Sequence, residues 1–149
     1  MKKLVLILFL AFCGISALQA QNLHLQSSIM SFLRNEGYTP SYDTDGDIQF
    51  KIQGNIYYVI VKEVDDYAYV EVRVPFSVDL PLSNLYVIAN KLNQTKYICK
   101  CSAYADEDGG NVFQLGMEFI ATTTAQAQIQ MQHAIRLLPL YIEAFEEEI

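Results

Sequence analysis

Residues 43–47 and 106–108 form two acidic loops that come nearest, in this sequence, to a metal-binding pattern. Carboxylates in a short loop that contains glycine are ligands that Ca²⁺ accepts. A helix–loop–helix calcium site, however, requires glycine at its sixth position and glutamate at its twelfth. Counted from Asp43, those positions hold Ile48 and Gly54. We therefore interpret residues 43–47 as an Asp/Gly turn that leads into a strand, with a weak calcium site as the alternative.

Cys99 and Cys101 are the second candidate for chemistry, because two thiols separated by one residue can form a redox pair. In an extended strand both side chains point to the same face. Their backbones then lie near the upper distance limit for a disulfide, and their side chains run parallel. We predict two free thiols that pack as small apolar groups, without an intramolecular disulfide. A redox-active pair is the alternative, although no cluster of histidine or lysine in the sequence indicates an activated thiol.

Catalytic patterns are absent from the sequence. The two histidines, His24 and His133, lie near opposite ends of the chain, so they lack the spacing of a metal site. There is neither a glycine-rich phosphate loop nor a nucleophile elbow. We expect a protein that is not an enzyme and that has no cofactor and no bound metal. The alternative is an envelope enzyme or a weakly calcium-dependent protein that uses the acidic loops.

Residues 1–20 have the layout of a secretory signal peptide. Two lysines precede an apolar run over residues 4–12, and small residues lead to a cleavage site after Ala20. The run is shorter than the roughly 20 residues that a membrane-spanning helix needs. We expect cleavage, a single domain over residues 21–149 without stable membrane insertion, and a periplasmic or secreted location. A retained membrane anchor is the alternative.

The charge of the mature chain argues against two classes of partner. Residues 21–149 carry eight basic and seventeen acidic side chains, a net charge of −9. Binding to nucleic acid requires a basic surface that releases counterions from the phosphates. Binding to anionic lipid head groups also requires basic residues. We therefore expect no nucleic acid and no membrane surface as a partner.

Three strands between residues 48 and 76 form the centre of the predicted fold. Apolar residues alternate with polar ones from Ile48 to Ile52 and again from Ala68 to Phe76, with a run rich in Tyr, Val and Ile between them. This alternation places one set of side chains on a core face and the other toward water. Short breaks at residues 54–55 and 65–66 favour hairpins, so we predict an antiparallel meander.

Tyr57, Tyr67 and Tyr69 make this meander rich in tyrosine. Because Tyr67 and Tyr69 alternate with the apolar residues of the third strand, they lie on its opposite face. Tyrosine suits a half-buried sheet face, so cross-strand pairing or packing under a helix accounts for these residues. The alternative is a ligand- or peptide-binding surface, because tyrosine is enriched at interfaces. All three tyrosines are candidates for a partner interface.

The spacing of apolar residues predicts helices over residues 24–36 and 82–94, and a third that runs from residues 122–124 to the C-terminus. Two further strands, residues 97–105 and 112–121, are joined by an Asp-Gly hairpin. The order is therefore helix, three strands, helix, two strands, helix. It predicts an α+β fold in which an antiparallel five-stranded sheet is flanked by helices.

The last helix carries the clearest apolar stripe. Its residues recur every three or four positions, and they include Met131, Ile135, Leu138 and Ile142. A stripe of this kind covers a sheet face, so we predict that these four side chains lie in the core.

The helix over residues 82–94 has a broad apolar arc that includes Leu85, Ile88 and Leu92. The arc covers roughly 160° of a helical wheel, whereas docking on a sheet requires about 100°. The surplus suits a second protomer, and a two-fold dimer is the commonest assembly. We take the three residues as candidate contacts of a homodimer. Burial of the whole arc within the same domain is the alternative.

The order of elements and several short segments resemble the YbjN family and its relatives, the type III secretion chaperones. The segments are Phe32 to Tyr38, Asp45 to Ile48, Ala89 to Asn93, the acidic hairpin at 106–110 and the long terminal helix. The resemblance covers nearly the whole mature chain. It implies an α+β fold with a curved antiparallel sheet flanked by helices. It also implies binding of a protein or peptide partner rather than catalysis, often as a homodimer.

The predicted signal peptide distinguishes this sequence from the secretion chaperones, which work in the cytoplasm. The family has no catalytic residues to carry over to this chain. We therefore expect an exported binding module, chaperone-like or regulatory, whose partner the sequence does not identify. A role as a cytoplasmic effector chaperone does not fit an exported protein.

Overall fold

The computed structural model describes residues 25–64 and 67–149 of the chain. The predicted signal peptide, His24 and the predicted turn at residues 65–66 lie outside the described residues. The first helix covers residues 25–35 of the described part. The other elements are, in order, β1 (Ser41–Tyr42), β2 (Ile48–Ile52), β3 (Asn55–Val64), β4 (Tyr67–Val78), α2 (Leu82–Thr95), β5 (Lys100–Ala105), β6 (Asn111–Ala121) and α3 (Thr124–Glu146).

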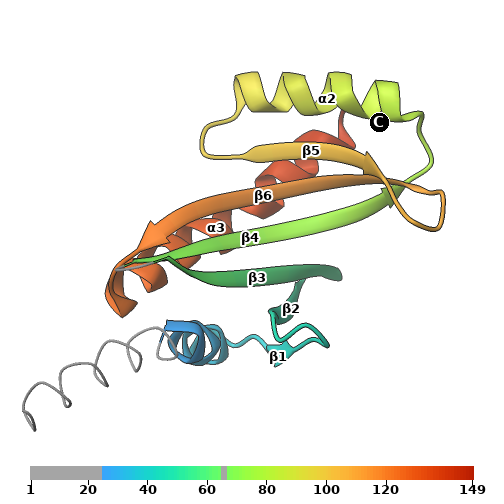
Figure 1. Cartoon of the computed structure of the whole chain (residues 1–149). Coiled ribbons are helices and arrows are strands. Elements are labelled where there is room, and N and C mark those ends of the chain that lie inside the picture. Colours follow the sequence, from blue (N-terminus) through green and yellow to red (C-terminus); the bar gives the residue numbers. More distant parts are fainter. Residues whose placement is uncertain (1–24, 65–66) are drawn as a thin grey trace, which may run out of the picture.

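The six strands of the described chain form one antiparallel sheet with the order β1-β2-β3-β4-β6-β5 (Figure 1). The predicted meander is confirmed, because β2, β3 and β4 are neighbours. The predicted hairpin between the last two strands is also confirmed, and β6 rather than β5 pairs with β4. The α+β class with helices beside an antiparallel sheet is therefore correct.

The sheet has one strand more than the five that the sequence predicts. β1 contains only two residues, which pair Ser41 with Gln49 and Tyr42 with Ile48. Two residues are too few to display a period-two alternation, so the pattern could not reveal this strand. The acidic turn at residues 43–47 consequently joins two strands of one hairpin.

β5 begins at Lys100 rather than at Tyr97, where the sequence predicts its start. The cause is the backbone of Ile98, whose φ of 65° lies in the left-handed region. A β-branched residue rarely adopts this conformation, and it interrupts an extended strand. The residue types at positions 97–99 favour a strand, so the sequence predicts a longer strand than the structure contains.

α3 and the first helix cover the same face of the sheet, and α3 runs behind β4 and β6 in Figure 1. The stripe predicted for the last helix is confirmed, because Met131, Ile135, Leu138 and Ile142 are all buried. Gln128 of α3 donates a hydrogen bond from Nε2 to Ser28 Oγ of the first helix at 3.2 Å. None of the helices among the described residues is long and apolar enough to cross a membrane.

α2 lies along β5 at one edge of the sheet (Figure 1). Near its end, the side chain of Asn93 makes two hydrogen bonds to the backbone of Cys101. Asn93 Oδ1 accepts from the Cys101 N–H at 2.7 Å, and Nδ2 donates to the Cys101 carbonyl at 3.0 Å. These bonds occupy backbone groups of an edge strand that would otherwise be available to pair with another chain.

Candidate partner-binding surface

The sheet face opposite α3 and the first helix is left uncovered by the helices of the described chain (Figure 1). We call this surface the open face. The alternate residues next to it on the strands, such as Val70, Val72 and Leu115, are fully buried on the core side. The open face consists of Tyr58, Ile60 and Lys62 of β3, Tyr67, Tyr69, Glu71 and Arg73 of β4, Gln114, Glu118 and Ile120 of β6, and Lys100, Ser102 and Tyr104 of β5.

The three tyrosines singled out by the sequence lie on different faces of the sheet. Tyr67 and Tyr69 are half-buried residues of the open face, as the alternation predicts. Tyr57 lies on the core face with 1% of its surface exposed. Its ring packs against Phe50 at a centroid distance of 5.4 Å, and burial raises its pKa. In this structure Tyr57 therefore supports the fold, and only Tyr67 and Tyr69 are available to a partner.

Glu71 and Glu118 lie directly opposite each other on β4 and β6. Two carboxylates in this register repel each other unless neighbouring groups compensate. Lys100 forms an ion pair with Glu118, and the Tyr69 hydroxyl hydrogen-bonds to the same carboxylate. Gln114 Nε2 donates to Glu71 Oε1 at 3.3 Å. The centre of the open face is therefore a network of polar side chains that hold each other in place.

This network shifts the pKa of its members in opposite directions. Burial raises the pKa of the Glu118 carboxyl, but the hydrogen bonds from Lys100 and Tyr69 more than offset it and hold that pKa below its ordinary range. The bond to Glu118 raises the pKa of Lys100. Burial and the bond to Glu118 raise the pKa of Tyr69, which remains a neutral donor. The ionised forms of both Glu118 and Lys100 are therefore favoured at neutral pH.

A glycine interrupts the next row of the open face. Gly116 of β6 lies between Arg73 on β4 and Lys100 on β5. A Cβ atom at this position would lie 3.3 Å from the Val72 carbonyl oxygen and 3.7 Å from Arg73 Cβ. Gly116 itself is buried, so this row places two cationic residues on either side of a position that has no side chain.

The predicted interface residues of α2 face inward. Leu85, Ile88 and Leu92 are 0%, 8% and 2% exposed and belong to the core of their own chain. The large apolar residues that α2 does expose are Tyr86 and Val87, at 53% and 69%. Self-association through α2 stays a prediction, but in this structure the surface offered to a second protomer is the one around Tyr86 and Val87.

The acidic loop at residues 43–47 is the Asp/Gly turn that the sequence predicts. Asp43 Oδ1 accepts hydrogen bonds from the backbone N–H groups of Asp45 at 3.0 Å and Asp47 at 2.9 Å. Gly46 adopts a φ of 85°, which closes the turn. The Asp43 carboxylate therefore organises the loop itself. Across the described residues, no three His, Cys, Asp or Glu side chains gather where they could hold a metal ion.

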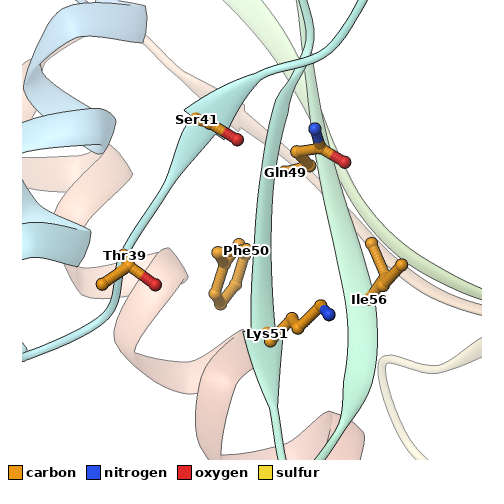
Figure 2. A pocket seen from close by; sticks show the side chains of 6 residues that line it. All are labelled: Thr39, Ser41, Gln49, Phe50, Lys51 and Ile56. Carbon is orange, nitrogen blue, oxygen red and sulfur yellow. The ribbon is translucent and has the colours of Figure 1, made fainter.

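A hollow of about 330 Å³ lies beside the end of β1 (Figure 2). β2 continues past the end of β1, and the segment before β1 bends away from β2, which leaves the hollow between them. Lys51 is the only ionisable side chain among the residues that line it, which are Thr39, Ser41, Gln49, Phe50, Lys51 and Ile56. This lining holds no acid–base pair, so the hollow resembles a gap at a sheet edge rather than a catalytic cleft.

Comparison with known proteins identifies the family of this chain. The model of the YbjN family, described as "Putative bacterial sensory transduction regulator", matches residues 26–147. The chain belongs to the YbjN family. No curated protein sequence matches it.

Two solved structures are similar to this YbjN-family chain. The crystal structure of YbjN from E. coli superposes with a TM-score of 0.54 at 8% sequence identity, covering 73% of this chain and 82% of that chain. The Yersinia pestis type III secretion chaperone SycH, solved in complex with a stable fragment of YscM2, gives a TM-score of 0.47 at 12% identity. That match covers 84% of this chain and 99% of that chain.

The sequence did not reveal the polar network of this YbjN-family protein. Lys100, Glu118 and Gln114 are distant in sequence from Tyr69 and Glu71, and only the register of β4, β6 and β5 brings them together. One feature of the sequence indicates these residues, because polar residues alternate with apolar residues along each of these strands. The alternation predicts an outward-facing polar row, but it does not predict which rows are neighbours.

Proposed function

We propose that this chain is an exported, non-catalytic binding module, chaperone-like or regulatory, whose open face recognises a protein or peptide partner. Membership of the YbjN family supports a regulatory or binding role. The observation that carries the proposal is the contrast between the two faces of the sheet. One face is closed by helices, whereas the other presents aromatic and charged side chains that no helix of residues 25–64 and 67–149 covers (Figure 1).

The composition of the open face suits a macromolecular partner. Tyr67 and Tyr69 supply apolar area together with hydroxyl groups, a combination that is enriched at protein interfaces. Arg73 and Lys100 lie in the row next to Glu71 and Glu118, so a row of cationic groups lies beside a row of carboxylates. A partner with complementary charges would be held in one register on this face.

The polar groups of the open face are paired with each other rather than aimed into a cavity. The Glu118 carboxylate is engaged by Lys100 and Tyr69, which favours its ionised form. A general acid or base needs a proton-transfer group within reach of a bound substrate, usually with a pKa near the working pH. The network therefore supports binding and alignment better than it supports acid–base catalysis.

Export is part of the proposal and rests on the sequence of residues 1–20. Two basic residues, a short apolar run and a site after Ala20 follow the order of a cleaved signal. Expression in a Gram-negative host tests it directly. A mature protein that begins at Gln21 in the periplasmic fraction is the expected result, and an intact N-terminus in the cytoplasm would contradict export.

Affinity capture followed by calorimetry tests the open face. The wild-type chain is used to capture partners from an envelope extract, and each captured protein is then purified and titrated against the wild type and variants. Tyr69→Ala and Arg73→Ala should each weaken binding about tenfold or more, the effect expected for residues central to an interface. Circular dichroism establishes that the variants are folded.

Tyr86→Ala is the matched control, because it removes an exposed tyrosine from α2 rather than from the open face. It should leave the affinity unchanged. Equal affinities for the wild type and both open-face variants would refute the open face as the binding site. A loss confined to Tyr86→Ala would place the interface on α2 instead.

A further inference from the structure

The two thiols of the mature chain lie closer together than an extended strand predicts. Cys99 Sγ and Cys101 Sγ are 3.6 Å apart. A disulfide bond is about 2.05 Å long, so the sulfur atoms need to approach by only about 1.5 Å to form one. Cys101 is 6% exposed, whereas Cys99 is half-buried. Cys101 is thus enclosed, whereas Cys99 is partly accessible at the edge of the core.

The backbone before the pair explains this geometry. Ile98 has a φ of 65°, so the chain does not enter β5 as a regular strand and Cys99 is not held in the sheet. The Tyr141 hydroxyl of α3 donates a hydrogen bond to the Tyr97 carbonyl at 2.5 Å, which fixes the segment in this course. A β-branched residue in a left-handed conformation is strained, and such strain clusters at functional positions.

The surroundings make the two cysteines chemically different. The hydrogen bond from the Cys101 thiol lowers the pKa of Cys99, and the backbone amide of Gly116 and the charge of Lys96 add to this against the effect of burial. The same hydrogen bond and burial raise the pKa of Cys101. Burial raises the pKa of Tyr141, and the charge of the nearby Cys99 adds to this. Cys99 therefore has the character of an attacking thiol.

We propose that Cys99 and Cys101 form a dithiol site that reacts with small or protein disulfides and closes to an intramolecular disulfide. In the first step the Cys99 thiolate attacks a disulfide RSSR, forms a mixed disulfide and releases one RS⁻. In the second step the Cys101 sulfur attacks Cys99 Sγ and releases the other RS⁻. The two protons of the protein thiols end on the leaving groups, so one disulfide is reduced to two RSH while the dithiol is oxidised.

Asn93 determines which side of the site moves. Its two hydrogen bonds hold the Cys101 backbone against α2, so the backbone that carries the buried thiol is fixed. Because Tyr141 holds the Tyr97 carbonyl, closure must then come from Cys99 and Ile98, and Ile98 is 66% exposed. Oxidation would thus reshape an exposed apolar segment. A disulfide across a single residue is strained, so it should be readily reduced.

Reaction with oxidised glutathione tests the site in the full chain carrying Cys13→Ser, so that the pair holds the only thiols. Intact mass measurement should show the loss of two hydrogen atoms and no glutathione adduct. The Cys101→Ser variant should instead accumulate a stable adduct at Cys99. The Cys99→Ser variant should react about tenfold more slowly, because its remaining thiol is buried.

A Lys96→Gln variant tests the environment of Cys99, with Lys51→Gln on β2 as the matched control. Lys96→Gln should slow adduct formation and move its pH profile upward, and the control should do neither. A wild-type pair that stays reduced in oxidised glutathione, or that carries two adducts, would overturn the proposal. Equal rates for the two single cysteine variants would overturn the assignment of Cys99 as the attacking thiol. If a variant does not fold, alkylation of the wild-type protein followed by peptide mapping shows which of the two cysteines reacts first.

Discussion

The side chain of Asn93 hydrogen-bonds to the backbone of β5 at the edge of the sheet. It lies near the C-terminal end of α2, where a polar side chain often satisfies nearby backbone groups. In the structure its amide forms both hydrogen bonds to the backbone of Cys101, on the edge strand beside the helix. The side chain thus takes the place of a neighbouring strand, because an amide carries one donor group and one acceptor in the same plane.

Asn93→Ala should destabilise the protein. The substitution removes two part-buried hydrogen bonds to Cys101, and a typical intramolecular hydrogen bond contributes about 0.5–1.5 kcal/mol. Urea denaturation followed by circular dichroism measures this loss. Asn90→Ala on the same helix is the control, because Asn90 is exposed like Asn93 but the bonds to Cys101 come from Asn93, and it should change stability by less than about 0.5 kcal/mol. Equal stabilities of the two variants would show that the edge does not depend on Asn93.

The ion pair of Lys100 and Glu118 should contribute stability within a defined pH range. The pKa of Glu118 is lowered from its ordinary value of 4.5, so its contribution is present above 4.5 and is lost as the pH falls through the lowered pKa. The pKa of Lys100 is raised from 10.5, so its contribution is present below 10.5 and is lost as the pH rises through the raised pKa.

Glu118→Gln should therefore be less stable than the wild type at neutral pH, and the difference should vanish in acid. Because the Lys100 side chain is 63% exposed, solvent screening limits the loss to about 1 kcal/mol or less. Denaturation midpoints measured from acid to neutral pH give the result. Glu107→Gln in the exposed β5–β6 loop should show no such dependence. A difference that persists unchanged into acid would mean that charge is not its cause.

At the scale of elements, the register of the first hairpin decides what the tyrosines of β3 do. Gln53 and Gly54 have φ values of 52° and 89° and form the two-residue turn, so Ile52 pairs with Asn55 and Phe50 with Tyr57. This pairing sends Tyr57 into the core. The sequence indicates a break one residue later, at residues 54–55, and a shift of one residue moves a side chain to the other face.

Leu138→Ala in α3 should cost about 2–5 kcal/mol, because it leaves a cavity at a fully buried position. Leu140→Ala is a close control, since Leu140 lies on the same helix but is 54% exposed. It should cost less than about 0.5 kcal/mol. Chemical denaturation at equilibrium compares the two. A small loss at Leu138 would mean that the helix does not pack on the sheet as the structure has it.

At the scale of the whole molecule, the long periodic elements were predictable and their neighbours in space were not. Alternation revealed β2, β4 and β6, and helical spacing revealed α3, because each is long enough to repeat its pattern. The two residues of β1 are too few to show an alternating pattern. Ile98 lies before β5 in a backbone conformation that its residue type disfavours, so its residue type predicts a strand that does not form there. The open face arises from strand order, which local pattern does not encode.

The arrangement of α2 in the whole molecule leads to a last prediction, on self-association. α2 buries Leu85, Ile88 and Leu92 in its own domain and leaves Tyr86 and Val87 in solvent at the edge of the sheet. We predict a two-fold dimer in which these two residues meet their copies, because a self-complementary apolar patch is satisfied by the same patch on a second chain.

Sedimentation of the mature chain at micromolar concentration distinguishes the outcomes. Val87→Asp should convert a dimer to a monomer, because it places a charge at the interface. The thermal stability of the monomer should be unchanged, because the aspartate is then exposed to solvent. Ile88→Asp should instead unfold the chain, since it buries an unpaired charge in the core. A wild-type protein that sediments as a monomer would exclude the dimer. A dimer that persists in Val87→Asp would place the contact elsewhere on the molecule.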